Sequence, residues 1–186
     1  MKTLIAYGTR YGATATTAEE ISRVFQEQGH DVSVVDLKKG KIKNISDFDL
    51  VVIGSGMRMF RWVGEAESFI KKFQKELRQK MTAIFVSSGA QALHKYDGAI
   101  EEMDTAWKKY LVEKAEKYSL QPSSMAIFGG VWDYNKMGFP FKQTMIPFQE
   151  KLREAGIQES EPGVYDTRDW DEIRNWALAL AEKAYE

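Results

Sequence analysis

The stretch Thr3-Leu-Ile-Ala-Tyr-Gly-Thr-Arg-Tyr-Gly-Ala-Thr14 decides the fold of this chain. Residues 3–7 are apolar or β-prone in succession, which is typical of a strand buried on both faces of a parallel sheet. The loop that follows has hydroxyls at both ends and a glycine between them, and a helical pattern begins directly after it. We therefore expect a strand, a short loop and a helix, which is how a βαβ unit begins.

Outward from this stretch, similar apolar runs recur at residues 32–37, 50–53, 82–86 and 125–128. Helical stripes separate or follow them, and the clearest consists of Ala66, Phe69, Ile70, Phe73 and Leu77. Strands that alternate with helices imply right-handed crossovers and a parallel sheet covered on both faces. The sequence thus predicts a three-layer α/β sandwich in which residues 1–186 form a single domain.

The amino-acid composition excludes several kinds of partner and functional site. The 26 Lys and Arg against 27 Asp and Glu give a net charge of −1 without a basic patch, so we expect no nucleic-acid partner. The absence of cysteine removes thiolate nucleophiles, iron–sulfur clusters and Cys-based zinc sites. With only His30 and His94, a His-rich metal site is excluded as well, and we expect no metal. A bound organic cofactor is the leading source of chemistry.

We also expect a cytoplasmic protein. The first apolar run is too short for a secretory signal, and no window approaches the roughly 20 apolar residues that span a bilayer.

In an open parallel sheet, ligands bind where the carboxyl ends of the strands meet their loops. The loop at residues 9–14 matches neither G-x-G-x-x-G nor G-x-x-x-x-G-K-[ST], which disfavours dinucleotide and Walker-type sites. Its backbone N–H groups, its threonines and the dipole of the next helix can instead wrap a phosphate. The alternative, weighted equally, is a helix capped by a hydroxyl group.

Two later loops offer contacts for a flat ring. In the first, Gly56 permits close approach of the backbone to a ligand, whereas Met59 and Phe60 are expected to pack the next helix onto the sheet. In the second, Ser88 and Gly89 can hydrogen-bond the edge of a polar heterocycle. His94 and Tyr96 are candidate neighbours of the ring, and we assign no catalytic role to His94; the catalytic residues stay unassigned.

The segment after the fifth strand, residues 129–148, is rich in aromatic residues and interrupted by Pro140 and Pro147. We favour a cover over the ligand that also shapes a substrate pocket. Packing on the sheet as core is the second interpretation, and a membrane-facing patch with Lys136 and Lys142 is the third.

Together these loops resemble the flavodoxin-like superfamily. The resemblance rests on Thr9-x-x-Gly12-x-Thr14, on Val51-Val-Ile-Gly54 with the loop after it, and on Ser88-Gly89. The menaquinone-dependent protoporphyrinogen dehydrogenase branch is the nearest, through the opening Met1-Lys-Thr-Leu-Ile5, Thr9-Arg10, Arg58, the aromatic insert and Asp169-Trp170. That branch's insert is rich in Arg and Tyr, whereas residues 131–148 contain only two lysines as cations, so its porphyrin substrate is not carried over.

The resemblance implies a flavodoxin-like fold with five parallel strands in the order 2-1-3-4-5, and FMN as the cofactor. The residues implied at the phosphate are Thr9, Arg10, Tyr11, Gly12, Ala13 and Thr14. Those implied around the ring are Gly56, Met57, Arg58, Ser88, Gly89, Val131 and Trp132. The Gly56 peptide is expected to adjust when the flavin gains a proton, and Arg58 to stabilise reduced, anionic flavin by Coulomb attraction.

The implied function is an oxidoreductase that passes electrons from a small organic substrate through FMN to a quinone. A flavodoxin-type electron carrier with a protein redox partner is the alternative, and a binding module that has lost the cofactor is the third class. A homodimer and a peripheral contact with the inner face of the membrane through residues 131–148 are further expectations.

Overall fold

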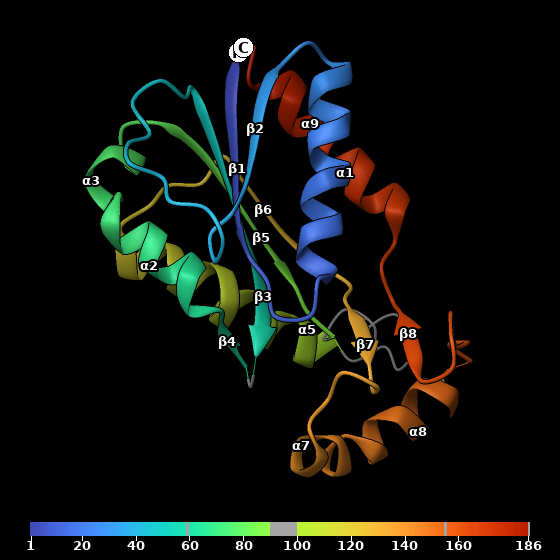
Figure 1. Cartoon of the computed structure of the whole chain (residues 1–186). Coiled ribbons are helices and arrows are strands. Elements are labelled where there is room, and N and C mark those ends of the chain that lie inside the picture. The colour runs from blue at the N-terminus through green and yellow to red at the C-terminus, as the bar shows by residue number, and fades with distance from the viewer. Residues whose placement is uncertain (59, 90–99, 155, 186) are drawn as a thin grey trace.

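The computed structural model describes residues 1–58, 60–89, 100–154 and 156–185 (Figure 1). Its central sheet consists of β1 (Lys2–Gly8), β2 (Asp31–Asp36), β3 (Leu50–Arg58), β5 (Met81–Ser87) and β6 (Ser124–Phe128). These strands are parallel and run in the order β2-β1-β3-β5-β6, which confirms the expected order of five strands. One strand was not expected: β4 (Arg61–Trp62) pairs antiparallel with the end of β3.

Helices cover both faces of the sheet (Figure 1). One face carries α1 (Ala13–Glu27) and α9 (Trp170–Lys183). The other carries α2 (Gly64–Lys72), α3 (Gln74–Leu77), α5 (Ile100–Trp107), η1 (Lys108–Val112) and α6 (Glu113–Tyr118). Each face has its own apolar cluster. Leu4 and Ala6 of β1 join the cluster beneath α2, whereas Ile5 joins the cluster beneath α1. This double burial explains why β1 and β5 are apolar over successive residues, whereas the edge strand β2 is not.

Two features of the sequence set where helices begin and divide. Asp169 accepts hydrogen bonds from the N–H groups of Asp171 and Glu172, at 3.1 and 3.0 Å, and so caps α9. The stripe from Ala66 to Leu77 divides at Phe73 into α2 and α3.

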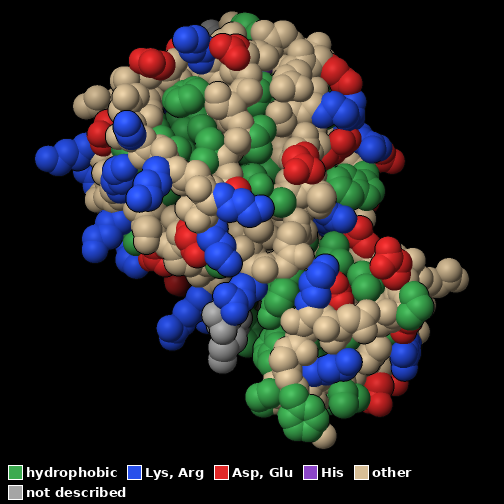
Figure 2. Space-filling model, in the orientation of Figure 1, with side chains coloured by type: hydrophobic (Ala, Val, Ile, Leu, Met, Phe, Trp, Pro, Cys, Tyr) green, Lys and Arg blue, Asp and Glu red, His purple; other side chains and the backbone are tan. Residues whose placement is uncertain are grey.

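The aromatic insert forms a lobe beyond the carboxyl edge of the sheet, residues 131–166 (Figures 1 and 2). It contains β7 (Val131–Asp133), α7 (Phe139–Thr144), α8 (Ile146–Glu154) and β8 (Val164–Asp166), and β7 pairs antiparallel with β8. Tyr134, Leu152 and Tyr165 are the centre of a third apolar cluster, separate from the two that flank the sheet. The lobe therefore has its own core, and the second interpretation, that the insert packs on the sheet as core, is wrong.

Candidate cofactor site

The strand register brings four strand ends together at one edge. Gly8 of β1 pairs with Ser55 of β3, and Gly56 of β3 pairs with Ser87 of β5. Ser87 in turn pairs with Phe128 at the end of β6. The loops that follow these strands therefore begin side by side at the carboxyl edge of the sheet, as expected for a ligand site in an open parallel sheet.

The loop after β1 presents the start of α1. The Gly12 N–H donates to Oγ1 of Thr9 at 3.0 Å, and Gly12 takes a left-handed φ of 103°. Gly12 is the N-cap residue of α1, which has no side-chain cap and no acidic residue in its first turn. The alternative of a hydroxyl-capped helix is therefore wrong, and the first-turn N–H groups and the helix dipole face a potential anion.

Thr14 links this loop to the end of β3, where Gly56 lies within the strand, so the expected position of Gly56 in a loop is wrong. Its side chain is only 1% exposed, and a Cβ added to Gly56 would lie 3.0 Å from its Oγ1. A side chain at Gly56 would fill the space in front of that hydroxyl. The structure thus brings Thr14 and Gly56 together, as a ligand that contacts both loops requires.

The opposite end of the edge is formed by Gly89 and the lobe. A Cβ added to Gly89 would lie 2.0 Å from Cζ2 of Trp132, so the indole rests directly on the Gly89 backbone. The Phe148 ring of α8 packs on Trp132 with 4.3 Å between centroids. Nε1 of Trp132 and Oγ of Ser87 are buried and have no hydrogen-bond partner among the described residues. These two polar atoms are suited to a polar heterocycle.

Five more residues that the sequence predicts at the cofactor lie at or near this edge of the sheet. Arg10 and Tyr11 are exposed, and Ala13 begins α1. Ser88 is buried, and its N–H donates to the Phe128 carbonyl at 2.8 Å. Val131 opens β7 and is half-buried.

Other expectations concern the tip of the hairpin formed by β3 and β4. Met57 packs against the apolar cluster beneath α2. Phe60 is 74% exposed, so its expected packing of a helix onto the sheet is wrong. The Arg58 side chain, Met59, His94 and Tyr96 lie outside the described part of the structure.

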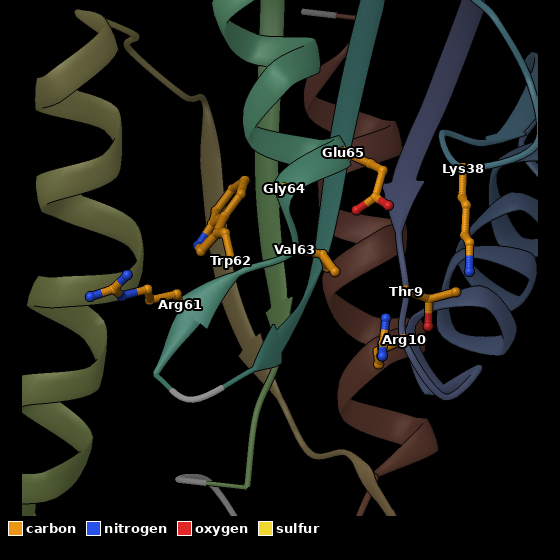
Figure 3. Close-up of a pocket in the computed structure, with 8 residues that line it drawn as sticks. All are labelled: Thr9, Arg10, Lys38, Arg61, Trp62, Val63, Gly64 and Glu65. Carbon is orange, nitrogen blue, oxygen red and sulfur yellow. The ribbon is translucent and has the colours of Figure 1, made fainter. Parts of the chain in front are cut away.

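A pocket of about 510 Å³ lies beside the phosphate-type loop (Figure 3). Its lining residues are Thr9, Arg10, Lys38, Arg61, Trp62, Val63, Gly64 and Glu65. In Figure 3, Lys38 and Arg10 lie on the same side of the pocket as Thr9, whereas Arg61 points away from them. Arg10 within this loop and Lys38 beside it therefore bring two cations near Thr9.

Sequence reasoning missed two basic residues here. Lys38 follows β2, in a loop with no motif that predicts a ligand contact. Arg168 lies between β8 and α9, and its guanidinium reaches the first turn of α1, donating to the Ala13 carbonyl at 3.3 Å. The sequence signal for Arg168 is indirect and weak: Val131-Trp-Asp133 and Val164-Tyr-Asp166 share a pattern, and their pairing as β7 and β8 precedes Arg168.

Two titratable groups near the site have shifted pKa values. Burial, helped by Asp36 and Glu19, raises the pKa of Tyr7, so this phenol at the end of β1 stays neutral. A hydrogen bond from Lys136 is the main cause that lowers the pKa of Asp133, so this carboxyl in β7 stays ionised. No cluster of metal-ligating side chains occurs in the ranges that the structure describes.

The residues present fit FMN. The uncapped start of α1 suits its phosphate. The space that Gly56 leaves at Thr14 lies next to that start, and the unpartnered Ser87 Oγ and Trp132 Nε1 lie at the other end of the edge. The site therefore offers an anion-binding end and an aromatic end.

Comparison with known proteins agrees with this fit. A family model described as a flavodoxin domain matches residues 4–156. Protoporphyrinogen IX dehydrogenase (quinone) of Escherichia coli (strain K12) is 24% identical over 181 residues, 97% of this chain and 95% of that protein. The Leishmania major protein of the same name is 25% identical over 181 residues, 97% of this chain and 74% of that protein.

Solved structures agree in fold. A flavodoxin from the domain Archaea superposes with a TM-score of 0.58 and 16% identity, over 100% of both chains. The two-electron reduced flavodoxin of Megasphaera elsdenii gives a TM-score of 0.55 and 20% identity, over 97% of this chain and 98% of the other.

Proposed function

This chain belongs to the flavodoxin domain family, an FMN-binding redox family, and from that membership we propose that it passes electrons from a small organic substrate to a quinone. FMN supplies the electron-transfer chemistry when it is bound. The residues of this chain bind it at the start of α1, orient its ring and shape the space in front of the ring.

The observation that carries the enzyme proposal is the aromatic wall formed by Trp132 and Phe148. It stands beside Gly89, at the end of the site opposite the phosphate-type loop, and a separate lobe with its own core supports it. An electron carrier needs only an accessible cofactor edge, whereas a wall of two packed rings restricts which molecules reach that edge. The wall supports a substrate pocket.

The charges of the lobe favour a flat, largely apolar substrate. Lys136 forms an ion pair with Asp133 at 2.8 Å and is thereby neutralised within the lobe. Lys142 is the other cation of residues 131–148. Farther along the lobe, Arg153 is paired with Glu159, and Lys151 is exposed on α8. The carboxylates of a porphyrinogen therefore find few unpaired cations in residues 131–148, although the curated relatives carry a porphyrinogen in their name. We therefore propose a neutral hydroaromatic substrate before a porphyrinogen.

We also propose that the tip of the lobe contacts the membrane surface, from where a lipid-dissolved quinone would be reached. Phe139 is 80% exposed and Ile146 is 44% exposed, and no acidic residue occurs in residues 134–149. Figure 2 shows apolar side chains at this end of the lobe. Exposed apolar groups with nearby lysines suit an anionic lipid surface. None of the helices in the described ranges is long and apolar enough to span a bilayer.

Liposome co-sedimentation tests this contact. We expect the chain to pellet with vesicles rich in phosphatidylglycerol, and the Phe139→Ser variant to pellet several-fold less. Phe60→Ser is the matched control. Phe60 is also strongly exposed, at 74%, but it lies between β3 and β4, outside the lobe. Equal loss in both variants, or no pelleting by the wild type, contradicts the contact.

Anaerobic stopped-flow absorbance tests the enzyme proposal. The FMN-loaded protein is mixed in separate runs with a neutral hydroaromatic donor and with protoporphyrinogen. A soluble menaquinone analogue is added afterwards. We expect one donor class to bleach the flavin in a single two-electron phase and the quinone to restore it. A protein that accumulates a one-electron reduced form and turns over no donor is an electron carrier instead.

A further inference from the structure

Arg168 occupies an unusual position for an arginine. Its side chain is only 8% exposed, and it lies outside the loops that follow the five parallel strands. Nε and Nη2 donate to the two carboxylate oxygens of Asp166 at 2.9 and 2.6 Å, a two-point contact that fixes the plane of the guanidinium. The guanidinium also lies 4.3 Å from the centroid of the Trp170 ring. Arg168 is therefore held rigidly from two sides.

The remaining nitrogen of Arg168 reaches the start of α1. Nη1 donates to the Ala13 carbonyl at 3.3 Å and to the hydroxyl of Thr16. The hydroxyls of Thr16 and Thr17 also donate to the Ala13 carbonyl, at 3.1 Å each. Three side chains thus converge on one carbonyl oxygen in the first turn of the helix.

This carbonyl belongs to the same planar peptide as the N–H of Thr14. Fixing the direction of the Ala13 C=O therefore fixes the opposite direction of the Thr14 N–H, which points out of the start of α1. That N–H is one of the first-turn donors without an intrahelical partner, the groups that bind an anion at a helix start.

The segment that carries Arg168 is also tied to the aromatic end of the site. Asp166 pairs with Val131 in the β7–β8 ladder. Thr167 and Gly130 exchange backbone and side-chain hydrogen bonds at 2.9 to 3.1 Å. One short segment therefore connects the start of α1 with the strand that carries Trp132.

We propose that Arg168 is a positioning residue for the FMN phosphate: held by Asp166, it fixes the first peptide of α1 so that the Thr14 N–H is set before the phosphate arrives. The proposal rests on FMN binding at this edge. When the Thr14 N–H is already oriented, FMN binding does not have to order the loop. The affinity for FMN therefore increases through its phosphate, and the affinity for the ring alone does not change.

Arg168→Met and Arg174→Met form a matched pair of variants. Arg174 also joins α9 to α1, through Glu20 at 2.5 Å, but it contacts the helix more than one turn beyond Ala13. Both variants remove an arginine that hydrogen-bonds to α1 from a distant part of the chain, and only the first removes a contact with the first turn of the helix.

Dissociation constants for FMN and for riboflavin, which lacks the phosphate, are measured by flavin fluorescence. We expect Arg168→Met to weaken FMN about tenfold, as the loss of a charge-assisted hydrogen bond implies, and to change riboflavin little. Arg174→Met should leave both constants near their wild-type values. Arg168→Lys, which keeps the charge, should show a smaller loss that is again confined to FMN, and it replaces the Met variant if that variant does not fold.

Amide exchange of the apoprotein gives a second readout without flavin. The Thr14 N–H should exchange faster in Arg168→Met than in Arg174→Met. Equal losses of FMN and riboflavin affinity, or the same profile for both arginine variants, overturn the positioning role. A wild type that binds riboflavin as tightly as FMN, or binds neither, overturns the FMN site itself.

Discussion

At the residue scale, one absent side chain affects how closely the phosphate-type loop approaches the end of β3. Gly56 leaves room for the hydroxyl of Thr14, which is buried yet lies 3.0 Å from where a Cβ would stand. A larger residue would meet Thr14 and the Gly8 carbonyl, 3.7 Å from that Cβ, at the point where the phosphate-type loop touches β3. The short distance between the phosphate-type loop and β3 therefore depends on glycine at position 56.

Gly56→Val should weaken FMN binding about tenfold or more, because an overpacked contact costs about 1–3 kcal/mol. The flavin midpoint potentials should shift too, since valine restricts movement of the peptide next to the ring. Gly64→Ala is the control, because a Cβ at Gly64 meets nothing within 4 Å. Fluorescence titration and spectroelectrochemistry measure the two effects; unchanged affinity and potentials would remove Gly56 from the site.

At the element scale, a carboxylate fastens α2 to α6. Glu67 accepts hydrogen bonds from Lys117 and from the Tyr118 hydroxyl, at 2.7 Å each, and Lys114 lies 3.1 Å away. These partners, Lys117 foremost, lower the pKa of Glu67 to about 2. The ionised form is therefore favoured by folding, and its contribution to stability is present above the ordinary pKa of 4.5 and lost as pH falls toward 2.

Glu67→Gln should lower the free energy of unfolding at pH 6 by about 1 kcal/mol, a value that allows for solvent screening of a partly exposed pair. The difference from the wild type should narrow as the pH is lowered from 4.5 to 2, the range over which Glu67 takes up its proton. Urea unfolding at a series of pH values measures it. Glu116→Gln, at an exposed position on α6, should show no such trend; a Glu67→Gln deficit that is constant with pH would contradict the linkage.

The elements also show what sequence can and cannot reveal. The five parallel strands were predictable because each has a short apolar or β-prone run, continuous in several of them, and Asp169 was predictable as a cap because its motif is local. Strands β7 and β8 have three residues each and pair across about thirty residues, so their local signal is weak and their partnership is a long-range property. Arg168 follows from that pairing, and it was missed for the same reason.

At the scale of the whole molecule, the chain is a flavodoxin-type sandwich with a lobe added at its carboxyl edge (Figure 1). The lobe leaves and rejoins the body through β7 and β8, and the Tyr134 N–H donates to the Gly163 carbonyl at 2.9 Å where the two chain segments part. This geometry allows the lobe to be shortened to a hairpin without moving either strand.

Replacing residues 135–162 by an Asn-Gly turn should therefore keep FMN binding, because the loop at residues 9–14, Gly56 and Arg168 stay in place. Tyr134→Thr and Tyr165→Thr are added so that the shortened hairpin does not expose the two rings that the lobe buries. Substrate-dependent quinone reduction should be lost, because Phe148 is removed and Trp132 loses its support. Steady-state assays compare the rate of quinone reduction by the shortened protein with that of the full chain. A retained rate would contradict a substrate pocket in the lobe.

The central claim is that the carboxyl edge of the sheet binds FMN, and an absorbance spectrum tests it most directly. The purified chain is incubated with FMN, passed through gel filtration and scanned through the visible range. We predict flavin bands that correspond to one FMN per chain. A colourless protein after gel filtration would contradict the account, whatever its fold.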